Sequence, residues 1–267
     1  MNLGLLNKNA LVLASSKGLG LACAKTLYQE GANLLICSRS EEHLLRAKKE
    51  IEKLKSRSQE TQVHYFVANL LYEKDINNLV QYAVNIFKQI DILVHNAGGP
   101  PSAPVDEITR EQWTESLNLN LRSFIRISDL ILPHMQKQKS GSIIAITSVS
   151  VKQPLKNLVL SNTTRLGVVG YAKTLANEYG QDNIRVNVVC PGPTLTDRMK
   201  ELIENTMHQT GKPRQEVKTT WTEQIPMGRM GKPEELANLV TFLASERASY
   251  ITGTAIQVDG GFVKGPF

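Results

Sequence analysis

Short apolar runs recur along the 267-residue chain, each of strand length and apolar at nearly every position. A strand with one solvated face alternates between apolar and polar residues, whereas a strand buried on both faces is continuously apolar. The pattern therefore predicts buried, parallel strands. The seven runs lie at residues 10–14, 33–37, 62–67, 91–95, 142–147, 185–189 and 255–258.

The segments between these runs carry apolar residues at helical spacing. Leu19 and Leu27 belong to one such stripe, and Gly31 follows it as a predicted C-cap. Thr109 and Gln112 form a predicted capping box at the start of another helix. Alternation of strands and helices over the whole length predicts a single α/β domain, residues 1–267, built on a Rossmann-type doubly wound parallel sheet of about seven strands.

Residues 194–226 interrupt this alternation, because they are helical in pattern but polar, and they contain no clear strand. In an open α/β sheet, a long excursion after a late strand lies above the carboxyl ends of the strands, where ligands bind. We expect these residues to form a lid over a substrate. An insertion without a functional role is the alternative.

The net charge of +6 and the isoelectric point near 9.2 raise the question of nucleic-acid binding. The most basic stretch, residues 39–57, contains seven Lys or Arg side chains and four Glu side chains at helical spacing. Interleaved charges of this kind are typical of a solvated helix face rather than of a surface that follows phosphates. We therefore expect no nucleic-acid partner.

The three cysteines, Cys23, Cys37 and Cys190, each stand in apolar surroundings, and no Cys-x-x-Cys pair occurs. This usage fits buried thiols in a reducing compartment, and it predicts no metal site. No apolar segment is long enough to span a bilayer, and the N-terminus lacks the basic region and cleavage site of a signal peptide. We expect a cytoplasmic protein without membrane association.

A glycine-containing turn, Ala14-Ser15-Ser16-Lys17-Gly18-Leu19-Gly20, follows the first predicted strand and opens a helix. Amides at a helix N-terminus present donors and a partial positive charge to a pyrophosphate, and glycines allow close approach. The strand–turn–helix context makes the motif specific. The predicted contacts to a dinucleotide are made by Ser15, Ser16, Lys17, Gly18, Leu19 and Gly20.

This turn resembles the Gly-x-x-x-Gly-x-Gly turn of the short-chain dehydrogenase/reductase family, with Ala14 in place of the first glycine. The extra methyl group is tolerated if the backbone φ at Ala14 is negative. Further motifs of the family follow in order over essentially the whole chain: His95-Asn96-Ala97-Gly98, Pro191-Gly192 and Val258-Asp259-Gly260-Gly261. The resemblance implies cofactor contacts from Asn69 and Leu70 near the adenine, and from Asn96, Ala97, Gly98, Pro191, Gly192, Thr194 and Thr196 elsewhere.

The end of the second predicted strand bears on the choice between NAD and NADP. An NAD site has an acidic residue there that holds the ribose 2′-hydroxyl and repels a 2′-phosphate. Ser38 occupies that position, and Arg39 follows with a guanidinium suited to phosphate. Lys17 adds a second cation within the phosphate turn. The sequence therefore favours NADP, the alternative being that both cations are ordinary surface residues.

By the same resemblance, the catalytic group would comprise Asn120, Ser148 and a Tyr-x-x-x-Lys motif. This chain has Ser161 in the position of the tyrosine and Arg165 in the position of the lysine. Arg165 keeps a fixed charge and several donors for ribose hydroxyls, on the same helix face as Ser161. An aliphatic hydroxyl is a much weaker acid than a phenol, so Ser161 is a poor direct proton donor.

Other proton routes remain open at this stage. Ser161 could relay a proton from water or orient a carbonyl together with Ser148, and Lys152 could supply a proton if it is partly desolvated. An exposed loop lysine is the simpler interpretation of Lys152. Tyr171 and Tyr179 lie too far along the predicted helix to replace the missing phenol.

Two functions follow from these residues. The first is an atypical NADP-dependent oxidoreductase for a small or medium ketone or an acyl thioester, since the chain most resembles the 3-oxoacyl carrier-protein reductase branch. The second is a catalytically silent NADP-binding protein that senses or regulates. The resemblance also implies a homotetramer, otherwise a homodimer, assembled through the helices that begin near Trp113 and Leu155 and through the seventh strand.

Overall fold

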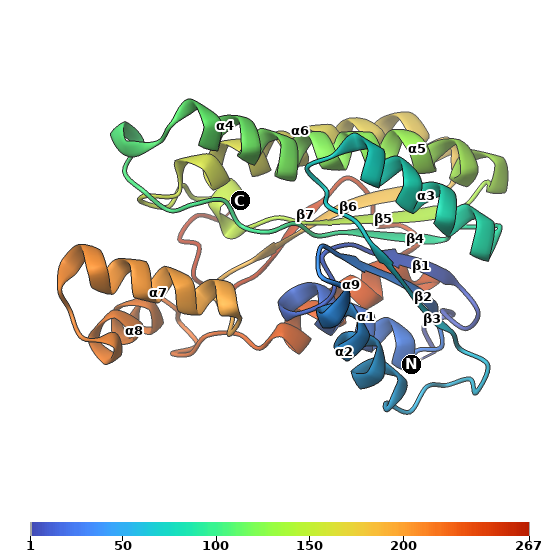
Figure 1. Ribbon diagram of the computed structural model, residues 1–267, viewed down its shortest axis with the longest axis horizontal. Helices are drawn as coiled ribbons and strands as arrows, with labels where there is room; N and C mark the ends of the chain where they lie inside the picture. The colour runs from blue at the N-terminus through green and yellow to red at the C-terminus, as the bar shows by residue number, and fades with distance from the viewer. Residues whose placement is uncertain (1, 267) are drawn as a thin grey trace.

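The computed structural model describes residues 2–266, and its centre is one parallel sheet with the strand order β3-β2-β1-β4-β5-β6-β7 (Figure 1). The chain adds strands outward from β1 to β3 and then returns to add β4 on the other side of β1. This order confirms the predicted doubly wound sheet of seven strands. The strands are β1 (Asn9–Val12), β2 (Asn33–Ser38), β3 (Val63–Val67), β4 (Ile92–His95), β5 (Gly141–Ile146), β6 (Ile184–Pro191) and β7 (Ala255–Val258).

Helices cover both faces of the sheet, as continuously apolar strands require (Figure 1). One layer consists of α1 (Gly18–Gln29), α2 (Glu41–Glu52) and α9 (Pro233–Ala244). The other layer consists of α3 (Glu73–Phe87), α4 (Arg110–Ser116), α5 (Ser123–Gln138) and α6 (Val159–Tyr179). Short 3-10 helices occur at Val105–Glu107, Val149–Val151, Gly180–Asp182 and Glu246–Ala248, and a π-helical turn occurs at Leu117–Arg122.

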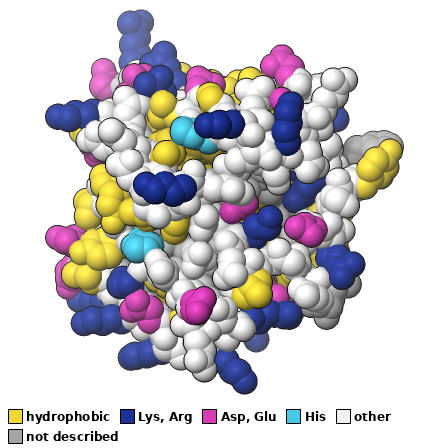
Figure 2. All heavy atoms as spheres, turned by 90° about the vertical axis from the view of Figure 1, so that its right-hand side faces the viewer, with side chains coloured by type: hydrophobic (Ala, Val, Ile, Leu, Met, Phe, Trp, Pro, Cys, Tyr) yellow, Lys and Arg dark blue, Asp and Glu magenta, His cyan; other side chains and the backbone are white. Residues whose placement is uncertain are grey.

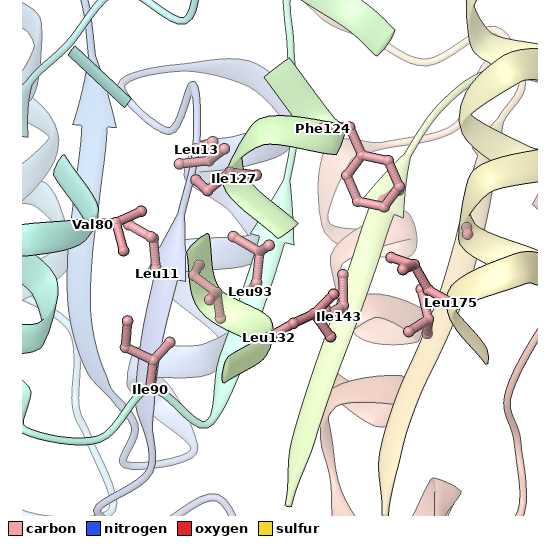
Figure 3. Packing of buried hydrophobic residues seen from close by; sticks show 14 of the residues in the cluster. Leu11, Leu13, Val80, Ile90, Leu93, Phe124, Ile127, Leu132, Ile143 and Leu175 are labelled. Atoms are coloured by element: carbon pink, nitrogen blue, oxygen red, sulfur yellow. The ribbon is translucent and has the colours of Figure 1, made fainter. Parts of the chain in front are cut away.

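Alternate residues along the central strands belong to two separate buried clusters, one beneath each helical layer. Leu11 of β1 and Leu13 directly after it belong to the cluster under α3 and α5, whereas Val12 belongs to the cluster on the opposite face. Figure 3 shows Leu11 beside Val80 of α3 and Leu13 beside Ile127 of α5. Apolar side chains on both faces of each strand fix the sheet in the middle of the molecule.

Helix termini follow the local signals in the sequence. The Thr109 hydroxyl accepts a hydrogen bond from the Gln112 amide at 3.3 Å, and the Gln112 side chain accepts one from the Thr109 amide at 3.0 Å. This reciprocal pair is the predicted capping box at the start of α4. Gly31 follows α1 with a φ of 90°, which confirms its predicted place as the C-cap glycine.

Residues 194–226 form two helices, α7 (Asp197–Thr210) and α8 (Arg214–Glu223), which extend beyond the two layers at the left of Figure 1. Their polar faces point to solvent, and their few apolar residues form a third, smaller core with the C-terminal segment. The buried members of this core are Val149, Met199, Ile203, Val217, Ile225, Met230, Phe262 and Val263. The polar pattern of this region thus belongs to surface helices that need only a narrow apolar stripe.

On the face in Figure 2, Lys and Arg side chains are scattered among Asp and Glu side chains rather than gathered in one patch. No helix within residues 2–266 is long and apolar enough to cross a membrane. The same residues contain no group of three or more His, Cys, Asp or Glu side chains that could hold a metal ion.

Candidate active site

A cavity of about 640 Å³ opens along the carboxyl ends of β1, β2, β4, β5 and β6. The order of strands reverses here, and ligands of doubly wound sheets bind at such a point. The cavity has a polar end at β1 and β2 and a more apolar end under α7 and α8. The predicted site residues that line it are Ser16, Lys17, Gly18, Leu19, Ser38, Arg39, Asn69, Leu70, Asn96, Ala97, Gly98, Ser148, Ser161, Arg165, Pro191, Gly192, Thr194 and Thr196.

Two residues of the glycine turn lie behind the lining rather than in it. Ser15 is fully buried, where its hydroxyl donates to the Val12 carbonyl at 2.7 Å and accepts from the Cys37 amide at 3.0 Å. A Cβ on Gly20 would lie 2.4 Å from the Ala14 carbonyl oxygen and 2.9 Å from the Asn96 side-chain nitrogen. Ser15 therefore joins the turn to β2, and Gly20 lets α1 approach the strand closely enough for its N-terminus to face the cavity.

Ala14 has a φ of 45°, in the left-handed region. The condition under which alanine replaces the family's glycine without strain, a negative φ, is therefore not met. For an alanine this conformation is unfavourable by about 1–2 kcal/mol relative to the right-handed region. The turn keeps the backbone path of a glycine motif even though this residue carries a side chain.

The polar end of the cavity places the Arg39 guanidinium, two hydroxyls and an imidazole around the end of β2. Ser38 ends the strand, Arg39 follows, and Ser40 caps α2 by accepting from the His43 amide at 3.3 Å. All four line the cavity, and His43 has no counterpart in the sequence-based site. Its place in the first turn of α2, beside Arg39, is the signal that could have identified it. Together these groups could hold a phosphate on the adenosine ribose.

Lys17 of the glycine turn reaches across the cavity entrance to the start of α7. Its ammonium lies 3.6 Å from the Asp197 carboxylate, and both side chains are more than half exposed. A hydrogen bond from Lys200, and to a lesser extent the charge of Lys17, lowers the pKa of Asp197. An exposed pair of this kind stabilises the fold by at most about 1 kcal/mol, so Lys17 is free to bind an anionic ligand instead.

At the other end of the cavity, Ser148 and Ser161 lie on either side of Ser150. The Ser148 hydroxyl accepts from the Ser150 amide at 3.1 Å, and the Ser150 and Ser161 hydroxyl oxygens lie 3.4 Å apart. Ser161 is 6% exposed and lines the cavity from α6. The structure thus brings the two predicted hydroxyls together at the end of β5, and no tyrosine of the described chain lines this cavity.

Arg165 lies one helical turn after Ser161 and is 8% exposed. Its Nη1 donates to the carbonyl oxygens of Ile146 and Thr147, at 3.1 and 2.9 Å. Burial, and secondarily the charge of Arg198, lowers the pKa of Arg165 to about 10, which keeps the guanidinium protonated at neutral pH. Arg165 is therefore a fixed cation that lines the cavity and is anchored to the two residues before Ser148.

Asn120 lies outside the cavity lining, in the π-helical turn Leu117–Arg122. It is buried, and its amide nitrogen donates to the Ser116 carbonyl at 3.2 Å, while its oxygen has no hydrogen-bond partner among the described residues. Lys152, the alternative proton source, caps a 3-10 helix and also lies outside the lining. The Tyr171 hydroxyl donates to Asp129 at 2.8 Å, away from the cavity.

His95 ends β4 and is buried against Phe124 and Ser123. Its Nε2 lies 3.0 Å from the Ser123 hydroxyl oxygen, and its Nδ1 has no partner within the described chain. Burial, with a smaller contribution from the charge of Arg165, lowers the pKa of His95 to about 3. The imidazole is therefore neutral at physiological pH.

The sequence-based site did not include the walls of the apolar end. Trp221, Leu202 and Met199 come from α7 and α8, and Leu155 and Leu158 come from the segment before α6. The helical spacing of residues 199 and 202 within an otherwise polar helix was the available signal.

A guanidinium stands at the edge of this apolar end. Arg198 donates to the Pro100 carbonyl and pairs with Glu201 at 2.8 Å. A Cβ on Gly99 would lie 2.6 Å from the Arg198 side chain. The first turn of α7 is therefore in direct contact with the loop that follows β4.

Comparisons with known proteins agree with this geometry. Residues 13–263 match the family described as enoyl-(acyl carrier protein) reductase. The 3-oxoacyl-[acyl-carrier-protein] reductase FabG of Aquifex aeolicus is 37% identical over 261 residues, covering 98% of this chain and 99% of that protein. Dehydrogenase/reductase SDR family member 4 of Oryctolagus cuniculus is 35% identical over 258 residues, covering 96% and 94%.

Among solved structures, L-sorbose reductase of Gluconobacter frateurii, in complex with NADPH and L-sorbose, superimposes with a TM-score of 0.92. It is 31% identical and covers 99% of this chain and 100% of its own. Similarity of this extent, in sequence and in fold, shows that the chain belongs to the short-chain dehydrogenase/reductase family of oxidoreductases.

Proposed function

We propose that this protein is an NADP(H)-dependent oxidoreductase that transfers hydride between the dinucleotide and a carbonyl or alcohol substrate, without the tyrosine acid of its family. The observation that carries the proposal is the continuity of one cavity. The same space is lined by the phosphate turn at one end and by Ser148, Ser161 and Arg165 at the other. A ligand that fills the first end therefore reaches the second.

The polar end fits NADP rather than NAD. Gly18, with a φ of 58°, and Gly20, which has no room for a Cβ, keep the α1 N-terminus open for a pyrophosphate. Ser38 and Arg39 stand where a carboxylate would repel a 2′-phosphate. NADPH is also the dinucleotide bound by L-sorbose reductase. Bound there, NADPH would supply the hydride for the reaction.

We assign the catalytic roles from the hydrogen-bonding groups that each side chain does not use within the protein. Arg165 uses Nη1 on backbone carbonyls and lines the cavity, where its other nitrogens would hold the nicotinamide ribose. Ser148 and Ser161 would orient the substrate carbonyl by hydrogen bonds. Asn120 would support the site from behind, since it lies outside the lining.

The apolar walls of the cavity indicate the kind of substrate and the role of residues 194–226. Trp221, Leu202 and Leu155 suit a ketone with a hydrocarbon portion or the acyl chain of a thioester, consistent with FabG among the relatives. We propose that residues 194–226 act as the lid of this substrate site, because α7 and α8 supply its outer wall.

A silent NADP-binding protein is the second candidate, and one observation favours it: no tyrosine of residues 2–266 lines the end of the cavity at Ser148, Ser161 and Arg165, the hydride-transfer end. NADPH binding measured by fluorescence, together with NADPH oxidation over a panel of carbonyl compounds, separates the two. An enzyme oxidises NADPH with at least one carbonyl and is slowed by Ser148→Ala. The paired change Ser161→Tyr and Arg165→Lys should raise turnover of activated ketones, since a positioned acid contributes about 10²–10⁴-fold in rate. Tight NADPH binding without oxidation by any variant supports the binding protein.

We propose a homotetramer in the cytoplasm, with a homodimer as the simpler assembly. β7 is the edge strand of the sheet and all of its residues are partly exposed, and α6 exposes Leu166 at 55%. Both surfaces would be covered in the expected assembly. Light scattering at micromolar protein concentration measures the mass, and a monomer there would rule out both forms.

A further inference from the structure

Ser150 is a buried serine beside the hydride-transfer end that the sequence-based site does not include. It is 2% exposed and lies behind the cavity rather than in its lining. It belongs to the short 3-10 helix Val149–Val151, which follows β5. Both hydroxyls of the hydride-transfer end contact it, one through its backbone and the other through its side chain.

The backbone contact holds Ser148. The Ser148 hydroxyl accepts from the Ser150 amide at 3.1 Å, as the capping residue of a short helix does. This bond does not involve the side chain at position 150, so it remains when that side chain is replaced. The contact to Ser161 is therefore the one that depends on having a hydroxyl at position 150.

Ser161 lacks the partner that a hydroxyl in a helix usually has. Such a hydroxyl commonly donates to the carbonyl four residues earlier, as the Thr164 hydroxyl does to Leu160 at 2.7 Å. Ser161 is the third residue of α6, so that carbonyl belongs to Asn157, before the helix, where it accepts from the Ala103 amide at 3.0 Å. Within residues 2–266, the Ser150 hydroxyl is the hydrogen-bond partner of the Ser161 side chain instead.

The two oxygen atoms, 3.4 Å apart, are farther from each other than in most hydroxyl pairs, where the distance is about 2.7–2.8 Å. Hydrogen bonds of catalytic groups are often long until substrate binds and shortens them. Either hydroxyl can donate, because each carries one proton and two lone pairs. The contact therefore sets the position of the Ser161 oxygen without deciding which of the two protons lies between them.

We infer that Ser150 is a positioning residue, which holds the Ser161 hydroxyl in place for the substrate without touching the substrate itself. The inference rests on the proposed hydride transfer and adds a residue to it. A serine side chain has three staggered χ1 rotamers, so an unpartnered hydroxyl samples several directions. Through Ser150, the same short helix that is capped by Ser148 also fixes Ser161, so the two hydroxyls keep one relative placement.

The activity test compares Ser150→Thr with Ser150→Val. Threonine and valine have nearly the same shape, so both disturb the packing at position 150 alike, and they differ in the hydroxyl. With a ketone that the wild type reduces, we expect Ser150→Val to lower kcat about 10-fold, since displacing an orienting group by about 1 Å can cost about 100-fold. Ser150→Thr should keep most of kcat. KM for NADPH should not change, because Ser150 lies outside the lining.

Ser150→Ala is the second variant, for the case in which the larger residues do not fold, and it should lower kcat as Ser150→Val does. Ser142→Ala is its matched control. Ser142 is 3% exposed, and its hydroxyl donates to the Leu243 carbonyl at 3.2 Å. It lies near the start of β5, about 20 Å of strand from Ser148, so its loss should leave kcat unchanged even where it lowers stability. Equal kcat in folded Ser150→Thr and Ser150→Val, or in Ser150→Ala and the wild type, would overturn the inference.

A thiol at position 161 tests the contact without turnover. Ser161→Cys makes this side chain titratable, and the rate of its alkylation by iodoacetamide follows the fraction of thiolate. Residue 161 lines the cavity, so the reagent reaches it. Burial raises the pKa of each native thiol, and mass spectrometry separates their products from that of the new one: these thiols are Cys23, Cys37 and Cys190.

A thiolate has no proton, so in this background the Ser150 hydroxyl must donate. We expect the addition of Ser150→Val to raise the pH midpoint of alkylation by about 0.5–1 unit, the effect of losing one ordinary hydrogen bond to the anion. The addition of Ser150→Thr should leave the midpoint near that of Ser161→Cys alone, and Ser142→Ala should not move it.

The two measurements distinguish the ways of failing. Equal midpoints with Ser150→Thr and Ser150→Val, in a protein whose wild type oxidises NADPH with a carbonyl compound, would overturn the inference and leave the proposed hydride transfer intact. Different midpoints without NADPH oxidation by the wild type would support the contact between the hydroxyls and overturn the hydride transfer. Different midpoints together with the loss of kcat in Ser150→Val support both.

Discussion

The two ends of the cavity are built in different ways. At the β1–β2 end, the backbone of the turn and the N-terminus of α1 face the ligand, and Gly18 and Gly20 keep that backbone accessible. At the β5–α6 end, the surface is made by the side chains of Ser148, Ser161 and Arg165. A site made of backbone persists under many substitutions, whereas a site made of side chains changes its chemistry when one residue changes. The resemblance to the family motifs predicts that this chain keeps the first site and, with Ser161 and Arg165, changes the second.

Gly20 is the position where a side chain would disturb the backbone-lined end of the cavity most. A valine there would push side-chain atoms into the Ala14 carbonyl and the Asn96 side chain, neither of which can move freely. We expect Gly20→Val to weaken NADPH binding by about 100-fold, the equivalent of roughly 3 kcal/mol of steric strain. Fluorescence titration measures this change. Gly170→Ala is the control, since a Cβ there meets nothing within 4 Å, and it should leave affinity unchanged.

His95 tests how completely the carboxyl end of β4 is sealed from solvent. Its pKa in the folded protein, about 3, lies below the ordinary value near 6.5, so the unfolded chain binds the proton first. Stability is therefore complete above pH 6.5 and falls as the pH drops, by about 2 kcal/mol at pH 5. Urea denaturation between pH 7 and 5 measures this loss.

The control for that experiment is His43→Gln, which removes an exposed imidazole and should keep the full pH dependence. His95→Asn removes the titrating imidazole and should remove about 2 kcal/mol of the stability loss between pH 7 and 5. An unchanged slope in His95→Asn would contradict the assignment of the pH effect to this buried imidazole.

At the polar end of the cavity, we expect the Arg39 side chain, rather than the backbone, to determine whether NADPH or NADH binds more tightly. Arg39→Ala should lower NADPH affinity by about 10-fold, the value of one charge-assisted contact of roughly 1.5 kcal/mol, and should leave NADH affinity unchanged. Calorimetry with both dinucleotides at fixed salt provides the measurement. Arg46→Ala, in the following helix α2 and paired with Glu42, should change neither affinity.

Ala14 gives the smallest expected effect. Ala14→Gly relieves the left-handed conformation, worth about 1–2 kcal/mol, but restores about 0.5–1 kcal/mol of chain entropy to the unfolded state. We expect a net gain of about 0.5–1 kcal/mol in the free energy of unfolding. Ala47→Gly, at a helical position in α2, should lower the same quantity. A loss in Ala14→Gly would show that the methyl group packs favourably.

The sequence predicted the sheet because burial on both faces leaves continuous apolar runs, as in β1 and β5, and the helix starts because caps are local. The conformation of Ala14 was not predictable, since its φ is set by the turn as a whole rather than by the residue. The hydrogen bonds of Arg165 were not predictable either. Their acceptors, Ile146 and Thr147, lie on another element, and only the packing of α6 against β5 brings them within reach.

The π-helical turn at Leu117–Arg122 joins α4 to α5 without a break and holds one residue more than an α-helical turn would. Each residue advances an α-helix by about 100°, so the turn sets the rotational phase of α5 relative to α4. Deleting a single residue there would restore regular hydrogen bonding but would rotate Phe124 and Ile127 off the core face, or α4 off its own neighbours. This segment should therefore accept substitutions far more readily than deletions, and insertions or deletions among relatives should fall elsewhere.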